Sequence, residues 1–215
     1  MGSRAGSRPE NRGLAAKTRV YIEVGNKKTF ASAADWPGWS RGGKTEADAL
    51  ANLAAYAPRY AKVAKLAKVD FPDDPTAFVV VERQKGDVST DFGVPHRPAK
   101  DEETKLTPRE IERMAALMAA AWKYFDRVAA KAPNSLRKGP RGGGRDTDKI
   151  VEHVTGAELD YGKAIGLRLN EPDREALLES FRNPNRTERW PVRYAVRRTA
   201  WHALDHAWEI EDRIP

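Results

Sequence analysis

Helical periodicity in the second half of the chain sets the first constraint on the fold. Apolar side chains recur every three or four residues along one helix face: Ile111, Met114, Leu117, Met118, Ala121, Trp122, Phe125 and Val128. Thr107 is a favourable N-cap, Pro108 suits the first helical position, and Pro133 ends the helix. An apolar stripe of this kind is buried in a folded protein, so Met114 and Met118 are predicted to be packing residues.

Three further helices are predicted after this one. The second begins at Asp146 or Thr147 and ends near Gly166, the third spans 172–182, and the fourth spans 191–213. Four consecutive helices with short connections are most simply arranged as a bundle. Residues 106–215 are therefore predicted to form an all-α four-helix bundle.

The first part of the chain has a mixed pattern. Residues 19–33 alternate in the manner of two strands around a two-residue turn, Gly25-Asn26, which indicates a β-hairpin. Thr45 followed by Asp48 is typical of a helix cap, and Pro58 is expected to end or kink that helix. A further strand is predicted over residues 77–83, after a second short helix.

These patterns predict an α+β protein with four segments. Residues 1–17 are expected to be a disordered basic tail, because they are rich in Gly, Ser, Arg and Pro without periodicity. Residues 18–88 form a small α+β module, residues 89–105 are a linker with loop chemistry, and residues 106–215 are the helical domain.

The net charge of +7 raises the question of a nucleic-acid partner. More than half of this excess lies in residues 1–19, where five cations face one acid, and a second basic cluster lies in the glycine-rich segment 133–145. The basicity is therefore local, since charges in the remaining chain are close to balanced.

The absence of cysteine excludes disulfides, thiolate metal ligands and a cysteine nucleophile. No apolar run approaches the roughly 18 residues that span a bilayer, and the N-terminus lacks the apolar core of a signal peptide. We expect a cytoplasmic protein without membrane association. A transition-metal site would have to use histidine and carboxylate ligands.

Two of the four histidines, His202 and His206, are four residues apart in the last predicted helix. Their imidazoles can therefore point at one shared atom from one helix face. A third candidate, His153, lies in the second predicted helix of the bundle. Trp201 and neighbouring acidic residues surround the pair formed by His202 and His206. The fourth histidine, His96, lies in the predicted linker and is expected to be a solvated loop residue.

The stretches 150–158 (IVEHVTGAE) and 199–209 (TAWHALDHAWE) resemble the DinB/YfiT-like superfamily of metalloenzymes. The resemblance implies a helical bundle with a three-histidine site formed by His153, His202 and His206. It also implies a divalent transition metal, zinc or nickel, that activates water or a low-molecular-weight thiol. The interval between His153 and the pair is short for the family, so tighter connections are needed.

Other residues are candidates for supporting roles. Glu158 and Glu209 are candidate general acid-base or metal-orienting groups, although each can equally be a helix-surface residue. The glycine-rich loop carries Arg137, Arg141 and Arg145, which can bind carboxylates or phosphates, or simply be solvated. The loop lacks the ending of a nucleotide-binding Walker motif.

A second resemblance covers about fifty residues of the first module. The run 30–39 (FASAADWPGW) followed by 44–53 (KTEADALANL) resembles the HicB-type antitoxin-like module, a fold similar to a truncated double-stranded-RNA-binding domain. A simple turn from sheet to helix explains the same residues.

The leading hypothesis is a metal-dependent thiol S-transferase or hydrolase of the DinB-like class. It would use a small-molecule substrate and, since the chain has no cysteine, a thiol cosubstrate. The sequence is also compatible with a homodimer. The alternative is a nucleic-acid-binding or antitoxin-like regulator in which the helical domain is a scaffold. A third possibility is a metal site without turnover that only stabilises the fold.

Overall fold

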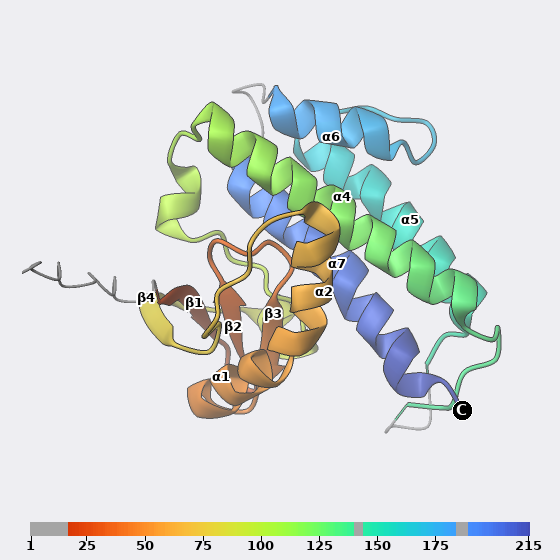
Figure 1. Cartoon of the computed structure of the whole chain (residues 1–215), viewed down its shortest axis with the longest axis horizontal. Helices are drawn as coiled ribbons and strands as arrows, with labels where there is room; N and C mark the ends of the chain where they lie inside the picture. Colours follow the sequence, from red (N-terminus) through yellow and green to blue (C-terminus); the bar gives the residue numbers. More distant parts are fainter. Residues whose placement is uncertain (1–16, 140–143, 184–188) are drawn as a thin grey trace, which may run out of the picture.

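The computed structural model describes residues 17–139, 144–183 and 189–215. A sheet with two helices comes first in the chain and a group of longer helices follows (Figure 1), which confirms the α+β class. The elements are β1 (Thr18–Val24), β2 (Thr29–Ala33), β3 (Ser40–Gly43), α1 (Glu46–Ala55), α2 (Ala57–Ala67), β4 (Phe78–Lys85), α3 (Val88–Phe92), the 3-10 helix η1 (Lys100–Glu103), α4 (Pro108–Lys131), α5 (Thr147–Ala164), α6 (Arg174–Arg182) and α7 (Val192–Arg213).

The four strands form one mixed sheet in the order β3-β2-β1-β4. The predicted hairpin is confirmed, because β1 and β2 pair antiparallel up to Val24 and Thr29. The predicted two-residue turn is wrong, since residues 25–28 form the loop. Asp91 on α3 explains the longer loop: its carboxylate accepts hydrogen bonds from the backbone N–H groups of Lys27 and Lys28. Strand β4 pairs parallel to β1, after the crossover through α1 and α2.

The helix ends follow the predicted local chemistry. Thr45 and Asp48 form a reciprocal capping box at the start of α1, and Thr107 and Glu110 form another at the start of α4. Pro58 lies in the first turn of α2, so the chain divides into two helices as expected.

Helix α7 lies at the centre of the molecule. It packs against α4 and α5, and α6 packs against α4 (Figure 1). The sheet part covers another side of α7, where Phe30 of β2 meets Trp201 edge to face with ring centroids 6.3 Å apart. Helix α2 also packs on α4, so one continuous apolar core joins the sheet part and the helices.

Residues 89–105, predicted as a linker, pack against both parts of the protein. Helix α3 contacts β2, and η1 contacts α7. Glu102 of η1 is buried and forms a two-contact ion pair with buried Arg197 of α7. The segment therefore holds α7 against the sheet instead of leaving two parts loosely connected.

None of the helices in the described part of the chain is long and apolar enough to cross a membrane.

Candidate metal centre

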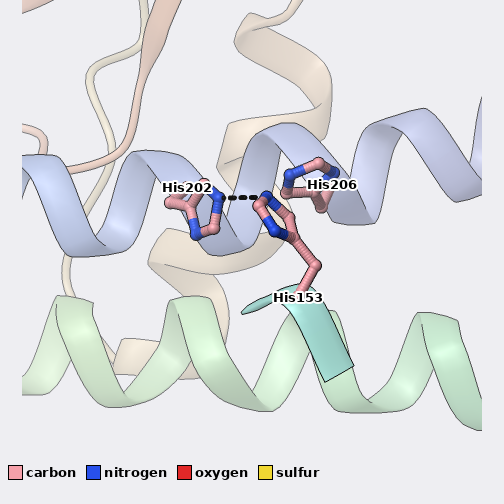
Figure 2. A group of neighbouring side chains, drawn as sticks. All are labelled: His153, His202 and His206. Atoms are coloured by element: carbon pink, nitrogen blue, oxygen red, sulfur yellow. Dashed lines mark hydrogen bonds between the residues drawn. The ribbon is translucent and has the colours of Figure 1, made fainter. Parts of the chain in front are cut away.

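Three histidines from two helices meet in one cluster (Figure 2). His202 and His206 project from successive turns of α7, and the ring of His153 reaches between them from α5. One ring nitrogen from each lies within 4.8 Å of the others, and the Nε2 atoms of His202 and His153 are 3.1 Å apart. The fold thus brings together all three histidines that the sequence proposed as ligands.

The cluster is held in a form suited to metal binding. Burial is the main cause that lowers the pKa of His202 to about 2, and the neighbouring His206 adds to this effect. Burial also lowers the pKa of His153. These two imidazoles are therefore neutral at pH 7. Their close Nε2 atoms cannot both carry protons, so at least one lone pair faces its neighbour.

Glu209 orients the third imidazole. Its Oε2 atom accepts a hydrogen bond from Nδ1–H of His206 at 2.7 Å, and its Oε1 atom accepts one from Nη1 of Arg213, also at 2.7 Å. The hydrogen bond with His206 is the main cause that keeps the pKa of Glu209 below its ordinary value, and the hydrogen bond with Arg213 contributes less. This arrangement leaves Nε2 of His206 as the lone-pair donor, as carboxylates do behind metal-bound histidines.

Three histidine nitrogens within 4.8 Å of one another could hold a divalent transition-metal ion. Two ligands at about 2.0–2.1 Å on a tetrahedral ion are separated by roughly 3.3 Å. The 3.1 Å between the Nε2 atoms of His202 and His153 is close to that separation. Three imidazole ligands suit zinc, nickel or a similar ion and leave one coordination position for a fourth ligand.

Glu158 occupies a different position from the one that the sequence suggested. Its carboxylate is buried and accepts a bifurcated hydrogen bond from Nε–H of Arg174, with N···O distances of 2.9 and 3.0 Å. Arg174 also binds Asp126 of α4. Glu158 therefore belongs to an ion-pair network that connects α5, α6 and α4, and burial raises the pKa of its carboxyl.

The arginine-rich loop lies beside the cluster. The buried Arg213 donates from Nε to the carbonyl of Arg137 and from Nη1 to the carbonyl of Arg145, both at 2.8 Å. The positive charge of Arg145 contributes to the lowered pKa of His153 and His202. Arg141, the third predicted anion-binding arginine, lies outside the described residues.

A cavity of about 580 Å³ opens next to Glu209, between this loop, α7 and β3. Arg41 of β3 reaches it and pairs with Asp205, which lies between the two histidines of α7. The cavity is lined by Arg41, Arg137, Lys138, Gly139, Asp205, Glu209, Asp212 and Arg213. Both parts of the protein thus contribute to the surroundings of the cluster.

No protein-family model, curated protein or solved structure matches this chain.

The sequence missed two arginines at the site. Arg213 holds Glu209 in place, and Arg198 is buried one helical turn before His202. A helical-wheel reading places Arg198, His202 and His206 on one face of α7, so the spacing carries this signal.

Proposed function

We propose that the protein is a metal-dependent enzyme in which His153, His202 and His206 hold zinc or nickel. The observation that carries the proposal is the cluster itself, because three buried or half-buried histidine rings converge without a carboxylate among them. Burial keeps the imidazoles of His202 and His153 neutral at pH 7, so their lone pairs are available to a metal ion.

The proposed class is DinB-like, with α4 to α7 as a four-helix bundle. The packing of α7 on α4 and α5, and of α6 on α4, supports this arrangement. The short interval between His153 and the pair is accommodated because α5 and α7 lie side by side.

A divalent ion bound in this way polarises a carbonyl group or lowers the pKa of bound water or thiol toward about 7. The chain's own residues would bind and position it. Glu209 fixes the tautomer of His206, and the aromatic ring of Tyr161 lies 5.7 Å from that of His202. Because the chain has no cysteine, an activated thiol would belong to a cosubstrate, and the proposed reactions are thiol S-transfer and hydrolysis.

The test is the metal content of the purified protein, measured by elemental mass spectrometry. We expect near one equivalent of zinc or nickel in the wild type and a loss of most of it in the His202→Ala/His206→Ala variant. His96→Ala is the matched control, because its side chain is 43% exposed and lies outside the cluster.

Retention of metal by His96→Ala alongside its loss in the double variant would assign the ion to the cluster. Failure of the wild type to bind either metal after reconstitution would refute the proposal. Equal metal content in the wild type and the double variant would place the ion elsewhere.

A second candidate function is binding to nucleic acid. A groove of about 710 Å³ between α2 and α4 is edged by two rows of cations, with Glu211 as the only carboxylate among its described lining residues. One row is Lys62 and Lys65 on α2 with Lys68 directly after it, and the other is Lys123, Arg127 and Lys131 on α4. Binding to phosphates would weaken steeply with salt, with a slope set by the number of contacts. A salt-independent affinity, or none, for RNA and DNA oligonucleotides would remove this candidate.

A further inference from the structure

Arg198 is a buried cation at the edge of the histidine cluster. It lies on α7 one turn before His202, and only 9% of the residue is exposed. Its guanidinium carbon lies 4.6 Å from the ring centroid of Trp201 and 5.2 Å from that of Tyr161. The two aromatic residues therefore form walls on which the guanidinium packs.

The guanidinium of Arg198 has no anionic partner in the described part of the chain. Among those residues no carboxylate lies within ion-pair distance, and Nη1 is buried without a hydrogen-bond acceptor. Its neighbours differ: Arg197 pairs with Glu102, and Arg213 pairs with Glu209. Aromatic contacts compensate only part of the cost of removing a cation from water.

The cation lies close to the histidines. Its positive charge contributes to the lowered pKa of both His202 and His153. Residues four apart on a helix share one face and are separated by a rise of about 6 Å, so Arg198 and His202 lie one turn apart on the same face of α7. Both groups contact the same aromatic ring, because the centroid of Tyr161 lies 5.2 Å from the guanidinium carbon of Arg198 and 5.7 Å from the ring centroid of His202.

We propose that Arg198 binds a carboxylate group of a small ligand beside the histidine cluster. A guanidinium presents two parallel N–H groups that match a planar carboxylate, and one negative charge neutralises one positive charge. A phosphate dianion is less suitable, because a second charge would be desolvated between aromatic walls without a partner. The role of this carboxylate as part of a substrate depends on the proposed function, whereas the binding itself depends on Arg198 alone.

Binding is tested by calorimetric titration of benzoate, acetate and inorganic phosphate into metal-free and zinc-loaded protein. We expect a carboxylate to bind wild-type protein, and Arg198→Met to weaken that affinity by about 10- to 100-fold, as for loss of a charged hydrogen bond. Arg198→Lys should lose part of the affinity, because it keeps the charge without the fork. Arg182→Gln is the control and should bind as the wild type does, because Arg182 is a partly exposed arginine of α6 that pairs with Glu112.

Thermal unfolding of the metal-free proteins gives a readout independent of activity. If the site is built for a ligand, Arg198→Met should be as stable as the wild type or more stable, because an unpaired buried cation is replaced by an apolar side chain of similar length. Benzoate should raise the melting temperature of the wild type and leave that of Arg198→Met unchanged.

Four outcomes would overturn the inference. Two concern the wild type: absence of carboxylate binding in both metal states, and tighter binding of phosphate than of any carboxylate. The other two are equal carboxylate binding by wild type and Arg198→Met, and a large loss of stability in Arg198→Met, which would show that the guanidinium is a structural group. Failure of the metal proposal is separate, because it appears as absence of metal from the wild type.

Discussion

Loss of the Glu102 charge should destabilise the protein strongly, because it leaves Arg197 buried and unpaired. The two side chains are 3% and 4% exposed, and Nε and Nη2 of Arg197 lie 2.6 and 2.8 Å from the two carboxylate oxygens. Glu102 also accepts from the backbone N–H of Ala99 at 2.7 Å, which holds η1 in place. Glu102→Gln keeps the size of the side chain, removes its charge and replaces one accepting oxygen with an NH2 group that faces an N–H donor.

The expected cost of Glu102→Gln is about 3–5 kcal/mol, the range for breaking a buried ion pair from one side. A domain is stabilised by only about 5–15 kcal/mol, so this is a large fraction. For a chain of this length, 1 kcal/mol shifts the melting temperature by about 2–4 °C, so a fall of roughly 10 °C is expected. The assay is urea unfolding monitored by circular dichroism, with thermal unfolding as a second measurement.

Two variants control for this interpretation. Glu152→Gln breaks an exposed pair with Lys149, whose side chains are 64% and 60% exposed, and should change stability by less than about 0.5 kcal/mol. Glu102→Leu combined with Arg197→Met replaces the pair by apolar groups and should recover most of the lost stability. A cost below about 1 kcal/mol for Glu102→Gln would refute the view that η1 and α7 are joined by an essential buried pair.

Three further predictions concern the cap of α4, the contact between the sheet and α7, and the metal cluster. Glu110→Gln should lower stability at neutral pH by about 1 kcal/mol after solvent screening. The hydrogen bond from Arg193 lowers the folded pKa of Glu110 to about 2, so this stabilisation is present above about pH 4.5 and lost between there and pH 2. Urea unfolding at pH 7 and pH 2.5 would show a difference between variant and wild type that shrinks at the lower pH; a constant difference contradicts the assignment. Gly38→Ala should cost about 1–3 kcal/mol, because φ is +91° and a Cβ would lie 2.7 Å from Cδ1 of Leu204; a melting temperature equal to the wild type's would contradict it. Glu209→Gln should weaken zinc affinity by about 10- to 100-fold in a chelator competition assay, while an unchanged affinity would show that His206 needs no carboxylate behind it.

Short-range patterns predicted the elements well. The apolar stripe of α4, its Thr107 cap and the Thr45–Asp48 box depend on residues three or four apart, and the structure confirms each. The pairing of β4 beside β1 was not predicted, because parallel strands are joined through a long crossover that leaves no local pattern.

The histidine pair on α7 could be proposed from spacing alone, since residues four apart share a helix face. His153 is a third candidate because the chain has four histidines and this one lies in a predicted helix, but its approach to the pair depends on how α5 packs against α7. Glu158 shows what sequence position cannot reveal. Its place five residues after His153 makes it a candidate acid-base or metal-orienting group, whereas in the fold its carboxylate pairs with Arg174.

Local chemistry along the chain is enough to decide which segments become helices, where they are capped and which histidines share one face. The packed structure alone decides which buried charges have partners. Arg197 and Arg198 are adjacent in sequence and both buried, yet Arg197 meets Glu102 while Arg198 meets only aromatic rings in the described part of the chain. The difference arises because adjacent residues on a helix point about 100° apart, so each faces a different neighbouring element.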